Sequence, residues 1–229
     1  MKILVTGENG QLGSELKKIS HTNSNFEWVF TDRQSFNISD LENVNVYLDK
    51  CNPNIIINCA AYTAVDRAED DFEFANIVNN EAISLITKWC NDNNCNLIHI
   101  STDYVYNGYS KTPYIEADET NPLNNYGKSK LLGDLACLKN NPSSIIIRTS
   151  WLYSSFGNNF LTKMILSQLF QTYLNLLFLL LFQQLFFVRR LNKKFHFYIE
   201  FQNLVLENLR LLGHEFQKNI QEFSRKILP

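Results

Sequence analysis

The sequence lacks an excess of charge of either sign. Its 21 Lys and Arg residues are balanced by 23 Asp and Glu residues, and the formal net charge at pH 7 is -2. Proteins that bind nucleic acid or anionic membranes usually carry a basic excess, because phosphate groups attract it. We therefore expect the partner to be a small molecule or another protein, and we expect no nucleic acid.

The sequence also lacks a cysteine framework and a leader-like N-terminus. Its five cysteines are odd in number and show neither CxxC nor CxxH spacing, so we interpret them as reduced thiols and expect no metal site. The apolar run in MKILVTG reaches glycine too early to form the hydrophobic stretch of a secretory signal. From these features we expect a cytoplasmic location.

Strand-like and helix-like patterns alternate through the first two thirds of the chain. Apolar, β-branched runs are typical of buried parallel strands, and apolar residues recurring every three or four positions are typical of helices. The predicted strands are 2–6, 26–32, 54–61, 96–102 and 143–150, and the predicted helices are 11–20, 41–50, 74–91 and 126–139. This alternation predicts an α/β fold, a doubly wound parallel sheet with helices on both faces.

Beyond Ser167 the composition changes. That part has one glycine, no Asp, no Cys and ten of the 17 Phe residues, and residues 164–188 contain no charged side chain. This uncharged stretch, followed by RRLNKK, has the length of a membrane span. Its several Gln, Asn and Thr residues dilute it, which favours an exposed, aggregation-prone apolar helix over a span. We predict a domain 1–166 and an atypical, helical Leu/Phe-rich tail 167–229.

A glycine-rich turn follows the first predicted strand and precedes the first predicted helix. In VTGENGQLGSEL, Gly7 permits a tight turn, Gly10 lets the backbone approach a pyrophosphate, and Gly13 lets helix and strand pack closely. The free amides at the helix N-terminus would hold the anion. The G-x-x-G-x-x-G spacing favours a dinucleotide-binding Rossmann fold of the short-chain dehydrogenase type over a turn without a ligand.

The second predicted strand ends in an acidic residue. Asp32 lies about twenty residues beyond the glycines, where a carboxylate would accept hydrogen bonds from the adenosine ribose hydroxyls. The neighbouring Arg33 could instead meet a 2′-phosphate. The cofactor is therefore predicted to be NADPH or NADH, with the choice between them open.

The segment NNYGKSKL places Tyr126 and Lys130 four residues apart, on one face of a predicted helix. A free phenol has a pKa of about 10, so proton transfer near neutral pH needs about 4 kcal/mol of phenolate stabilisation. A cation about 4 Å away at an effective dielectric constant near 20 provides roughly that amount. We predict that Tyr126 protonates a reduced carbonyl oxygen and that Lys130 lowers its pKa. Taken alone, such a pair is also common on ordinary helices.

A hydroxyl at the end of the fourth predicted strand strengthens this hypothesis. Thr102 stands at the carboxyl edge of the sheet, where open α/β folds bind ligands, and could reach the same substrate oxygen. The alternative is that Thr102, or Asp103 beside it, only caps a turn or helix. We favour the catalytic interpretation.

Five motifs together (TGENGQLG, NCAAYTAVDRAE, STDYVYNG, NPLNNYGKSKLLGD and RTSWLYSSFGNNF) resemble the dTDP-4-dehydrorhamnose reductases, a family of extended short-chain dehydrogenases. The resemblance runs from Met1 to about Ile165. It implies reduction of the 4-keto group of dTDP-4-dehydro-β-L-rhamnose by NADPH or NADH. It further implies a catalytic triad of Thr102, Tyr126 and Lys130.

The same resemblance implies binding roles for other residues. It assigns Gly10, Gln11 and Leu12 to the pyrophosphate, Asn37 and Ile38 to the adenine, Ala61, Tyr62 and Thr63 to the middle of the cofactor, and Asp103 and Trp151 to the substrate. Asn37 stands where the family often has Asp. Trp151 has an alternative role as a core aromatic after a buried strand. A homodimer is compatible with the resemblance.

The chain departs from the family pattern after Leu166. Family members continue with a smaller domain that closes over the sugar nucleotide, whereas the Leu/Phe-rich tail does not resemble it. We hypothesise a frameshift close to codon 166, and we expect the chain to bind NADPH or NADH but to reduce substrate poorly. The alternative is a non-catalytic dinucleotide-binding or regulatory subunit of the same fold.

Overall fold

A computed structural model describes residues 1–22, 25–157, 159, 162–164 and 167. All of them lie in the first of the two units into which the chain divides, Met1–Ser167. The predictions for the tail 167–229, for the stretch 164–188 and for a frameshift therefore fall almost entirely outside the described residues. Among the described residues, no helix has both the length and the apolar character needed to cross a bilayer.

Five parallel strands form the sheet in the order β2-β1-β3-β4-β5. In chain order they are β1 (Lys2–Thr6), β2 (Glu27–Thr31), β3 (Ile55–Asn58), β4 (Asn96–Thr102) and β5 (Ile145–Thr149). The register places Leu4 beside Val29 on one side and Ile56 on the other. Both Leu4 and Ile56 are fully buried, as expected for the centre of a parallel sheet that is covered on both faces.

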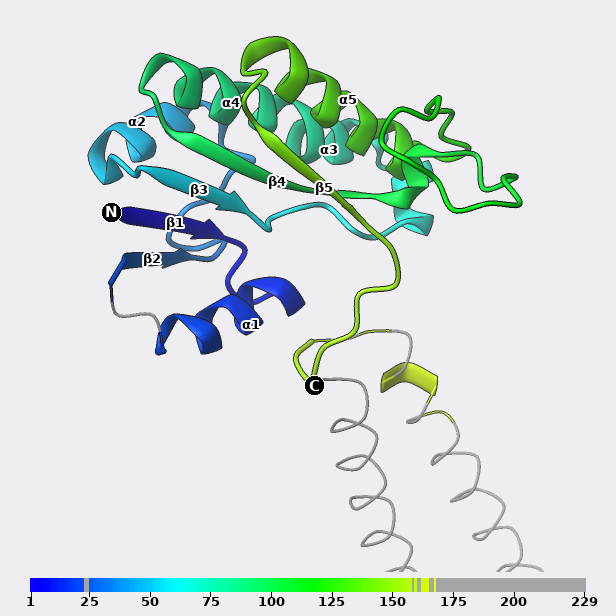
Figure 1. The fold of residues 1–229 in the computed structure, drawn as a ribbon, viewed down its shortest axis with the longest axis horizontal. Coiled ribbons are helices and arrows are strands. Elements are labelled where there is room, and N and C mark those ends of the chain that lie inside the picture. The colour runs from blue at the N-terminus through cyan, green and yellow to red at the C-terminus, as the bar shows by residue number, and fades with distance from the viewer. Residues whose placement is uncertain (23–24, 158, 160–161, 165–166, 168–229) are drawn as a thin grey trace, which may run out of the picture. The chain divides into compact units, whose positions relative to one another are not determined.

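The helices cover the two faces unequally. Figure 1 shows α1 on one face and the other α-helices on the opposite face. The α-helices are α1 (Gln11–Ser20), α2 (Leu41–Cys51), α3 (Phe72–Asn76), α4 (Ala82–Asp92) and α5 (Asn125–Asn140), with short turns η1 (Asp66–Glu69), η2 (Ile77–Glu81) and η3 (Asp103–Val105). The predicted doubly wound parallel fold is confirmed.

Two predicted elements differ from the structure. The helix predicted over 74–91 is continuous in direction but contains a π-helical turn, η2, between α3 and α4. The strand predicted over 54–61 ends at Asn58, because its neighbour β1 ends at Thr6, opposite Asn58, where Gly7 turns the chain away. The residues after Asn58 are thereby released to line a cavity.

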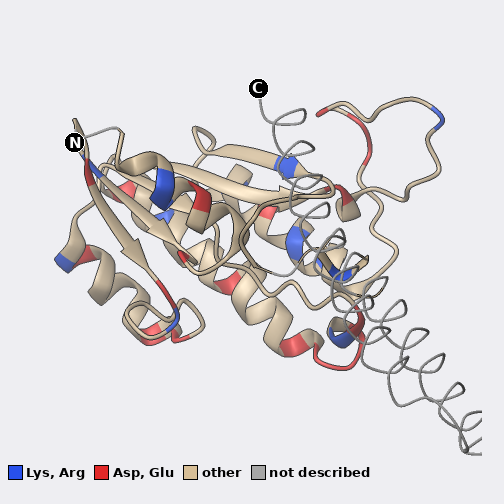
Figure 2. Ribbon diagram, turned by 90° about the horizontal axis from the view of Figure 1, so that it is seen from below, with Lys and Arg blue, Asp and Glu red and all other residues tan. Residues whose placement is uncertain are grey.

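The core lies between the sheet and helices α2 and α4. Leu48, Ile83, Ile86 and Leu97 are among its fully or almost fully buried members, and each such side chain contributes about 1.5–3 kcal/mol on removal from water. Figure 2 shows Lys and Arg interspersed with Asp and Glu over the described elements. The polar groups that are buried are concentrated near the carboxyl ends of the strands.

Candidate active site

A cavity of about 710 Å³ opens at the carboxyl ends of β1 and β3. The chain passes from β1 to β2 on one side of the sheet and then returns to β3 on the other, so the strand order reverses between β1 and β3. Open α/β sheets bind ligands at such a switch point, and the volume is in the range of small-molecule sites. The wall includes Gly7 after β1 and Ala60 after β3.

The glycine turn has the geometry that its residues predict. Gly7 has φ +71°, and a Cβ there would lie 2.8 Å from the backbone nitrogen of Ala60. A Cβ on Gly13 would collide with the Gly7 carbonyl oxygen and lie 2.7 Å from the Cα of Glu8. Helix α1 therefore starts tightly against the end of β1, a packing that side chains at these positions would prevent.

The N-terminus of α1 is open toward the cavity. Gly10 is its N-cap residue and provides no side-chain hydrogen bond, and the first turn contains no acidic residue. The first helical residues, Gln11 and Leu12, line the cavity together with Gly10. Unpaired amides at the start of a ten-residue helix suit the negative charge of a pyrophosphate.

The structure brings every predicted cofactor-binding residue to this one cavity. Its wall contains Gly7, Gly10, Gln11, Leu12, Gly13, Asp32, Asn37, Ile38, Ala61, Tyr62, Thr63, Tyr126 and Lys130. These residues come from positions that span more than half of the described chain, and the sheet gathers them at one edge.

Further wall residues were missed from the sequence. They are Asn9, Phe36, Ser39, Cys59, Ala60, Phe74, Val78, Ile100, Ser101, Thr149, Leu152 and Gly157. Several follow or end strands β3, β4 and β5, so extending the strand-end rule from Thr102 to every predicted strand would have found them.

Asp32 and Arg33 lie side by side in the wall. The Asp32 Oδ1 accepts from the backbone amides of Gln34 (3.0 Å) and Ser35 (2.9 Å), and its Oδ2 accepts from Asn9 Nδ2 (3.2 Å). The Ser35 backbone hydrogen bond is the main cause of a lowered Asp32 pKa. The Arg33 guanidinium lies 5.5 Å from the centre of the Phe74 ring. The wall thus offers a carboxylate for ribose hydroxyls and a cation for a 2′-phosphate.

Tyr126 is buried at the start of α5, and burial raises the pKa of its phenol. The nearby Thr102 side chain opposes this shift, while the charge of Asp103 adds to it. The prediction that Lys130 makes the phenol acidic is wrong for this structure, because desolvation of the ring dominates. The phenol is consequently neutral at pH 7 and carries a proton that it can donate.

Lys130 extends into the sheet from the same helical face. Its side chain is 2% exposed, and its Nζ donates to the Ile100 carbonyl oxygen at 2.7 Å. Burial lowers the pKa of Lys130 to about 8, and the nearby Asp134 carboxylate opposes this shift. At pH 7 the ammonium is therefore mainly charged, next to the backbone of β4 that lines the cavity.

Thr102 has the capping role that was the alternative interpretation of its position. Its Oγ1 accepts from the Tyr104 backbone amide at 3.2 Å and so caps η3, and its side chain is near enough to Tyr126 to act on the pKa of the phenol. Asp103 is held beside it, since its Oδ1 accepts from Thr102 (3.3 Å) and its Oδ2 accepts from the Ser150 hydroxyl (2.7 Å). Neither Thr102 nor Asp103 belongs to the cavity wall.

Trp151 is not brought to the cavity wall either. Its side chain is 64% exposed, so the alternative in which it is a core aromatic is wrong. Its backbone has φ +51°, an uncommon conformation for a residue that is not glycine. The residue lies just beyond β5 and points away from the hydrophobic core.

Asn79 supports the cavity wall, although no pattern in the sequence indicated it. It sits in the π-helical turn η2 and is 1% exposed. Its side chain accepts from the Tyr62 amide (2.9 Å) and donates to the Tyr62 carbonyl (3.0 Å) and to the Ser129 hydroxyl (3.0 Å). Asn79 therefore fixes a cavity-lining segment to α5, in a helix irregularity of the kind that often occurs at functional sites.

Comparisons with known proteins agree over the described part of the chain. Residues 1–176 match the family model described as the RmlD substrate binding domain. The dTDP-4-dehydrorhamnose reductase of Aggregatibacter actinomycetemcomitans is 40% identical over 164 residues, which are 72% of this chain and 56% of the relative. This chain therefore spans a little over half the length of the relative.

Two solved structures are similar in fold and sequence. A dTDP-4-dehydrorhamnose reductase from Clostridium acetobutylicum has a TM-score of 0.69 and 42% identity. One from Bacillus anthracis in complex with NADP has a TM-score of 0.68 and 34% identity. Each comparison covers 72% of this chain and 58% of the solved chain.

Proposed function

This chain belongs to the RmlD substrate binding domain family, and on that premise we propose that it binds NADPH or NADH and reduces the 4-keto group of dTDP-4-dehydro-β-L-rhamnose. The observation that carries the proposal is the meeting of three features in one cavity: the glycine turn at α1, the buried phenol of Tyr126 and the buried ammonium of Lys130.

The residues of the cavity fit a dinucleotide. The open amides at Gln11 and Leu12 would hold the pyrophosphate, because Gly10 leaves room for it and supplies no competing cap. Asn37 and Ile38 would contact the adenine, and Ala61, Tyr62 and Thr63 the middle of the cofactor. The bound dinucleotide would supply the hydride for the reduction.

The chemistry left to the protein is proton transfer and positioning. Tyr126 keeps its proton at neutral pH and would donate it to the carbonyl oxygen of the sugar as negative charge develops there. Thr102 would orient that oxygen from the other side, and the buried Lys130 ammonium would hold the nicotinamide ribose of the bound dinucleotide. Asp103 and Trp151 would contact the nucleotide sugar from beyond the cavity wall.

Two measurements on the full chain test this proposal. Titration of NADPH and of NADH, followed by the fluorescence of the reduced nicotinamide, should give saturable binding. Adding dTDP-4-dehydro-β-L-rhamnose should then oxidise the reduced cofactor, and Tyr126→Phe should abolish this oxidation while preserving binding. Failure of the full chain to bind either dinucleotide would refute the proposal.

A second function is suggested by the composition of the tail, because residues 177–229 lie outside the family match and are rich in Leu and Phe. In this alternative the chain is a non-catalytic dinucleotide-binding or regulatory subunit. It would bind NADPH or NADH with the same cavity, yet substrate would cause no oxidation above that of Tyr126→Phe. If the chain oxidised the reduced cofactor in the presence of substrate as fast as a full-length relative does, this alternative would be excluded. The expectation that the tail reduces turnover would be excluded as well.

The organisation of the chain is also part of the proposal. We propose that residues 1–166 act as the NAD(P)-binding domain, that residues 167–229 form a separate tail, and that the protein works in the cytoplasm. A homodimer is compatible with this organisation, and sedimentation of the purified chain would measure its oligomeric state.

A further inference from the structure

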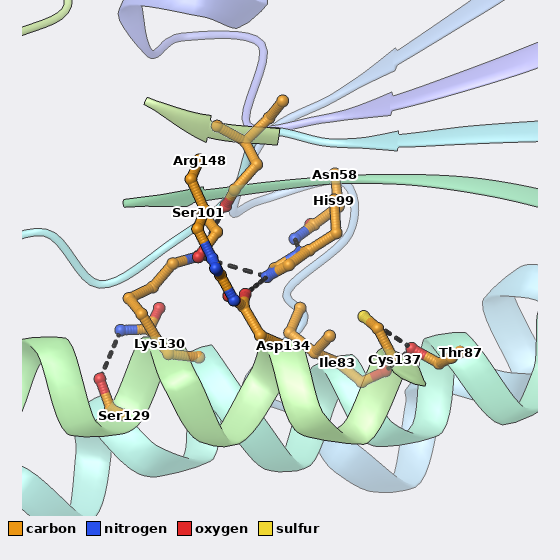
Figure 3. A network of polar contacts seen from close by, with 12 residues as sticks. Asn58, Ile83, Thr87, His99, Ser101, Ser129, Lys130, Asp134, Cys137 and Arg148 are labelled. Atoms are coloured by element: carbon orange, nitrogen blue, oxygen red, sulfur yellow. Dashed lines mark hydrogen bonds and ion pairs between the residues drawn. The ribbon is translucent and has the colours of Figure 1, made fainter. Parts of the chain in front are cut away.

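A buried polar network lies behind the cavity, between α5 and the sheet (Figure 3). His99 from β4 and Asp134 from α5 are both fully buried. The His99 Nε2 lies 3.5 Å from the Nζ of Lys130 and 3.9 Å from the Oδ1 of Asp134. The His99 Nε2 therefore faces both a buried ammonium and a buried carboxylate.

Hydrogen bonds on the far side of the ring determine its tautomer. The Ala60 amide donates to Thr6 Oγ1 (3.2 Å), and the Thr6 hydroxyl donates to Asn58 Oδ1 (2.6 Å). The Asn58 amide nitrogen donates to the Ala60 carbonyl oxygen (3.3 Å) and lies 3.1 Å from His99 Nδ1. With this amide orientation Nδ1 is an acceptor, so the proton of a neutral ring is on Nε2.

The ring is neutral for a clear physical reason. Burial lowers the pKa of His99 well below its ordinary value, and the charge of Lys130 lowers it further. A neutral ring with its proton on Nε2 places that N–H toward the Asp134 side of the network. The neutral ring therefore neither repels the Lys130 ammonium nor neutralises its charge.

Asp134 has one oxygen that is not used by a neighbour. Its Oδ2 accepts from the Arg148 Nε at 3.1 Å, whereas its buried Oδ1 has no hydrogen-bond partner among the described residues. Leaving a buried carboxylate oxygen unpaired is costly. The unpaired oxygen faces His99 Nε2, the same nitrogen that Lys130 approaches.

We propose that Asp134 is a positioning residue for the reductase chemistry, whose carboxylate helps to keep the Lys130 ammonium charged beside the cavity. This inference rests on the proposed function for its role, but its electrostatic content does not depend on catalysis. Burial raises the pKa of Asp134, and the ion pair with Arg148 at 3.1 Å opposes that shift and favours the carboxylate. The Arg148 Nη1 donates to the Tyr106 hydroxyl at 2.7 Å, which fixes the guanidinium.

The groups that face Lys130 leave Asp134 as the source of negative charge. They are Tyr126, Asp134 and Cys137 from α5, His99 from β4 and, through Asp134, Arg148 from β5. Burial raises the pKa of Cys137 to about 11 and also raises that of Tyr126, so both are neutral at pH 7. Arg148 is positive and His99 is neutral.

The size of the effect follows from the two distances. Because Lys130 Nζ and Asp134 Oδ1 lie 3.5 and 3.9 Å from the same nitrogen, they are at most about 7.4 Å apart. At an effective dielectric constant near 20, opposite charges at this distance shift a pKa by about one to two units. Removing the Asp134 charge should lower the pKa of Lys130 from about 8 to between about 6 and 7.

The experiment is an NMR titration of the full chain without cofactor, with ¹³C-labelled lysine side chains, from about pH 6 to about pH 10. Lys130→Met identifies the Lys130 Cε signal by its loss. In Asp134→Asn, which keeps the shape and can still accept from Arg148, the Lys130 midpoint should fall by at least about one unit. Asp134→Glu should restore most of the wild-type midpoint.

Asp92→Asn is the matched control, since it removes one exposed carboxylate at the end of α4 and should leave the midpoint unchanged. If Asp134→Asn does not fold, Ser101→Ala replaces it. Burial raises the pKa of Asp134 and the neighbouring Ser101 hydroxyl opposes this shift, so the loss of that hydroxyl should move the Lys130 midpoint in the same direction by a smaller amount. An unchanged midpoint in Asp134→Asn, or in Ser101→Ala where that variant is needed, would overturn the proposal.

The titration separates this inference from the proposed function. A lowered midpoint in a chain that binds no NADPH would support the electrostatic role and reject the reductase. If NADPH binds and the midpoint falls, the pH above which Lys130-dependent activity is lost should fall by the same one to two units. Normal NADPH binding with an unchanged midpoint would reject the role of Asp134 alone.

Discussion

Replacing Gly133 with alanine tests how closely α5 must approach the π-helical turn η2. Gly133 lies in the middle of α5, and a Cβ there would collide with the carbonyl oxygen of Asn79 and lie 3.3 Å from its carbonyl carbon. Both neighbours are backbone atoms, which cannot rotate away as a flexible side chain can. The new methyl group must therefore push α5 and η2 apart by about 1 Å to reach an ordinary contact distance.

The expected cost combines three terms. Overpacking in a close contact costs about 1–3 kcal/mol, and weakening the Asn79 side-chain bonds to Tyr62 and Ser129 costs about 1 kcal/mol for each bond lost. Against this, alanine is favoured over glycine in a helix by about 1 kcal/mol. We expect Gly133→Ala to lower the free energy of unfolding by about 3 kcal/mol, and Tm by about 6–12 °C for a unit of this size.

Urea denaturation followed by circular dichroism measures the free energy of unfolding, and a thermal scan measures Tm. Gly108→Ala is the control, because a Cβ there has no atom within 4 Å and its positive φ costs only about 1 kcal/mol. NADPH affinity should also fall in Gly133→Ala, since Asn79 holds Tyr62 in the cavity wall. A Gly133→Ala chain as stable as the wild type, or more so, would refute the close-packing argument.

Three further predictions concern the site. The pKa of Lys130 is about 8 in the folded chain against an ordinary 10.5, so between these pH values the unfolded chain binds one proton more than the folded chain. The free energy of unfolding of the wild type should therefore rise by about 3 kcal/mol as the pH increases through this window. Urea denaturation at pH 8 and at pH 10.5 should show that Lys130→Met lacks this rise, and an identical rise in that variant would count against the buried ammonium. Gly13→Ala, which drives a methyl group into the Gly7 carbonyl, should weaken NADPH binding at least about tenfold by distorting the amides at the start of α1. Fluorescence titration measures this affinity, and an affinity equal to that of the wild type would contradict the role of the glycine turn. Tyr126→Phe should leave NADPH affinity within about threefold but remove substrate-dependent oxidation, a loss of about a hundredfold or more, whereas residual wild-type turnover would assign the proton to another group such as Thr102.

The order of strands and helices could be predicted because each element repeats a simple local pattern. Runs such as KILVT and NLIHIST have no amphipathic alternation, and a strand of that kind is stable only when both of its faces are covered. Helix α1 carries Leu12, Leu16 and Ile19 at helical spacing directly after the glycine turn. These local signals agree with one another, so the parallel fold followed from them.

The break of the long central helix at η2 could not be predicted in the same way. No residue in Ile77–Glu81 is a helix breaker, and the π turn follows the contacts of Asn79 with Tyr62 and Ser129, which are 17 and 50 residues away. Contacts at such separations leave no periodic trace in the sequence. The same reason explains why Asn79 was missed as a support of the cavity wall.

The sequence alone determined which residue types meet at the cavity, because parallel strands all end at the same edge of a sheet and the residues after them must lie together. It therefore identified the glycine turn, Asp32, Tyr126 and Lys130 as neighbours, whereas Thr102 lies outside the cavity wall. Only the tertiary structure decided their protonation. Desolvation of Tyr126 and Lys130 depends on the helices and strands packed around them, and it raises the pKa of the phenol and lowers that of the amine. The Asp134 carboxylate opposes the burial that lowers the Lys130 pKa, and no local sequence pattern indicates its approach behind the sheet.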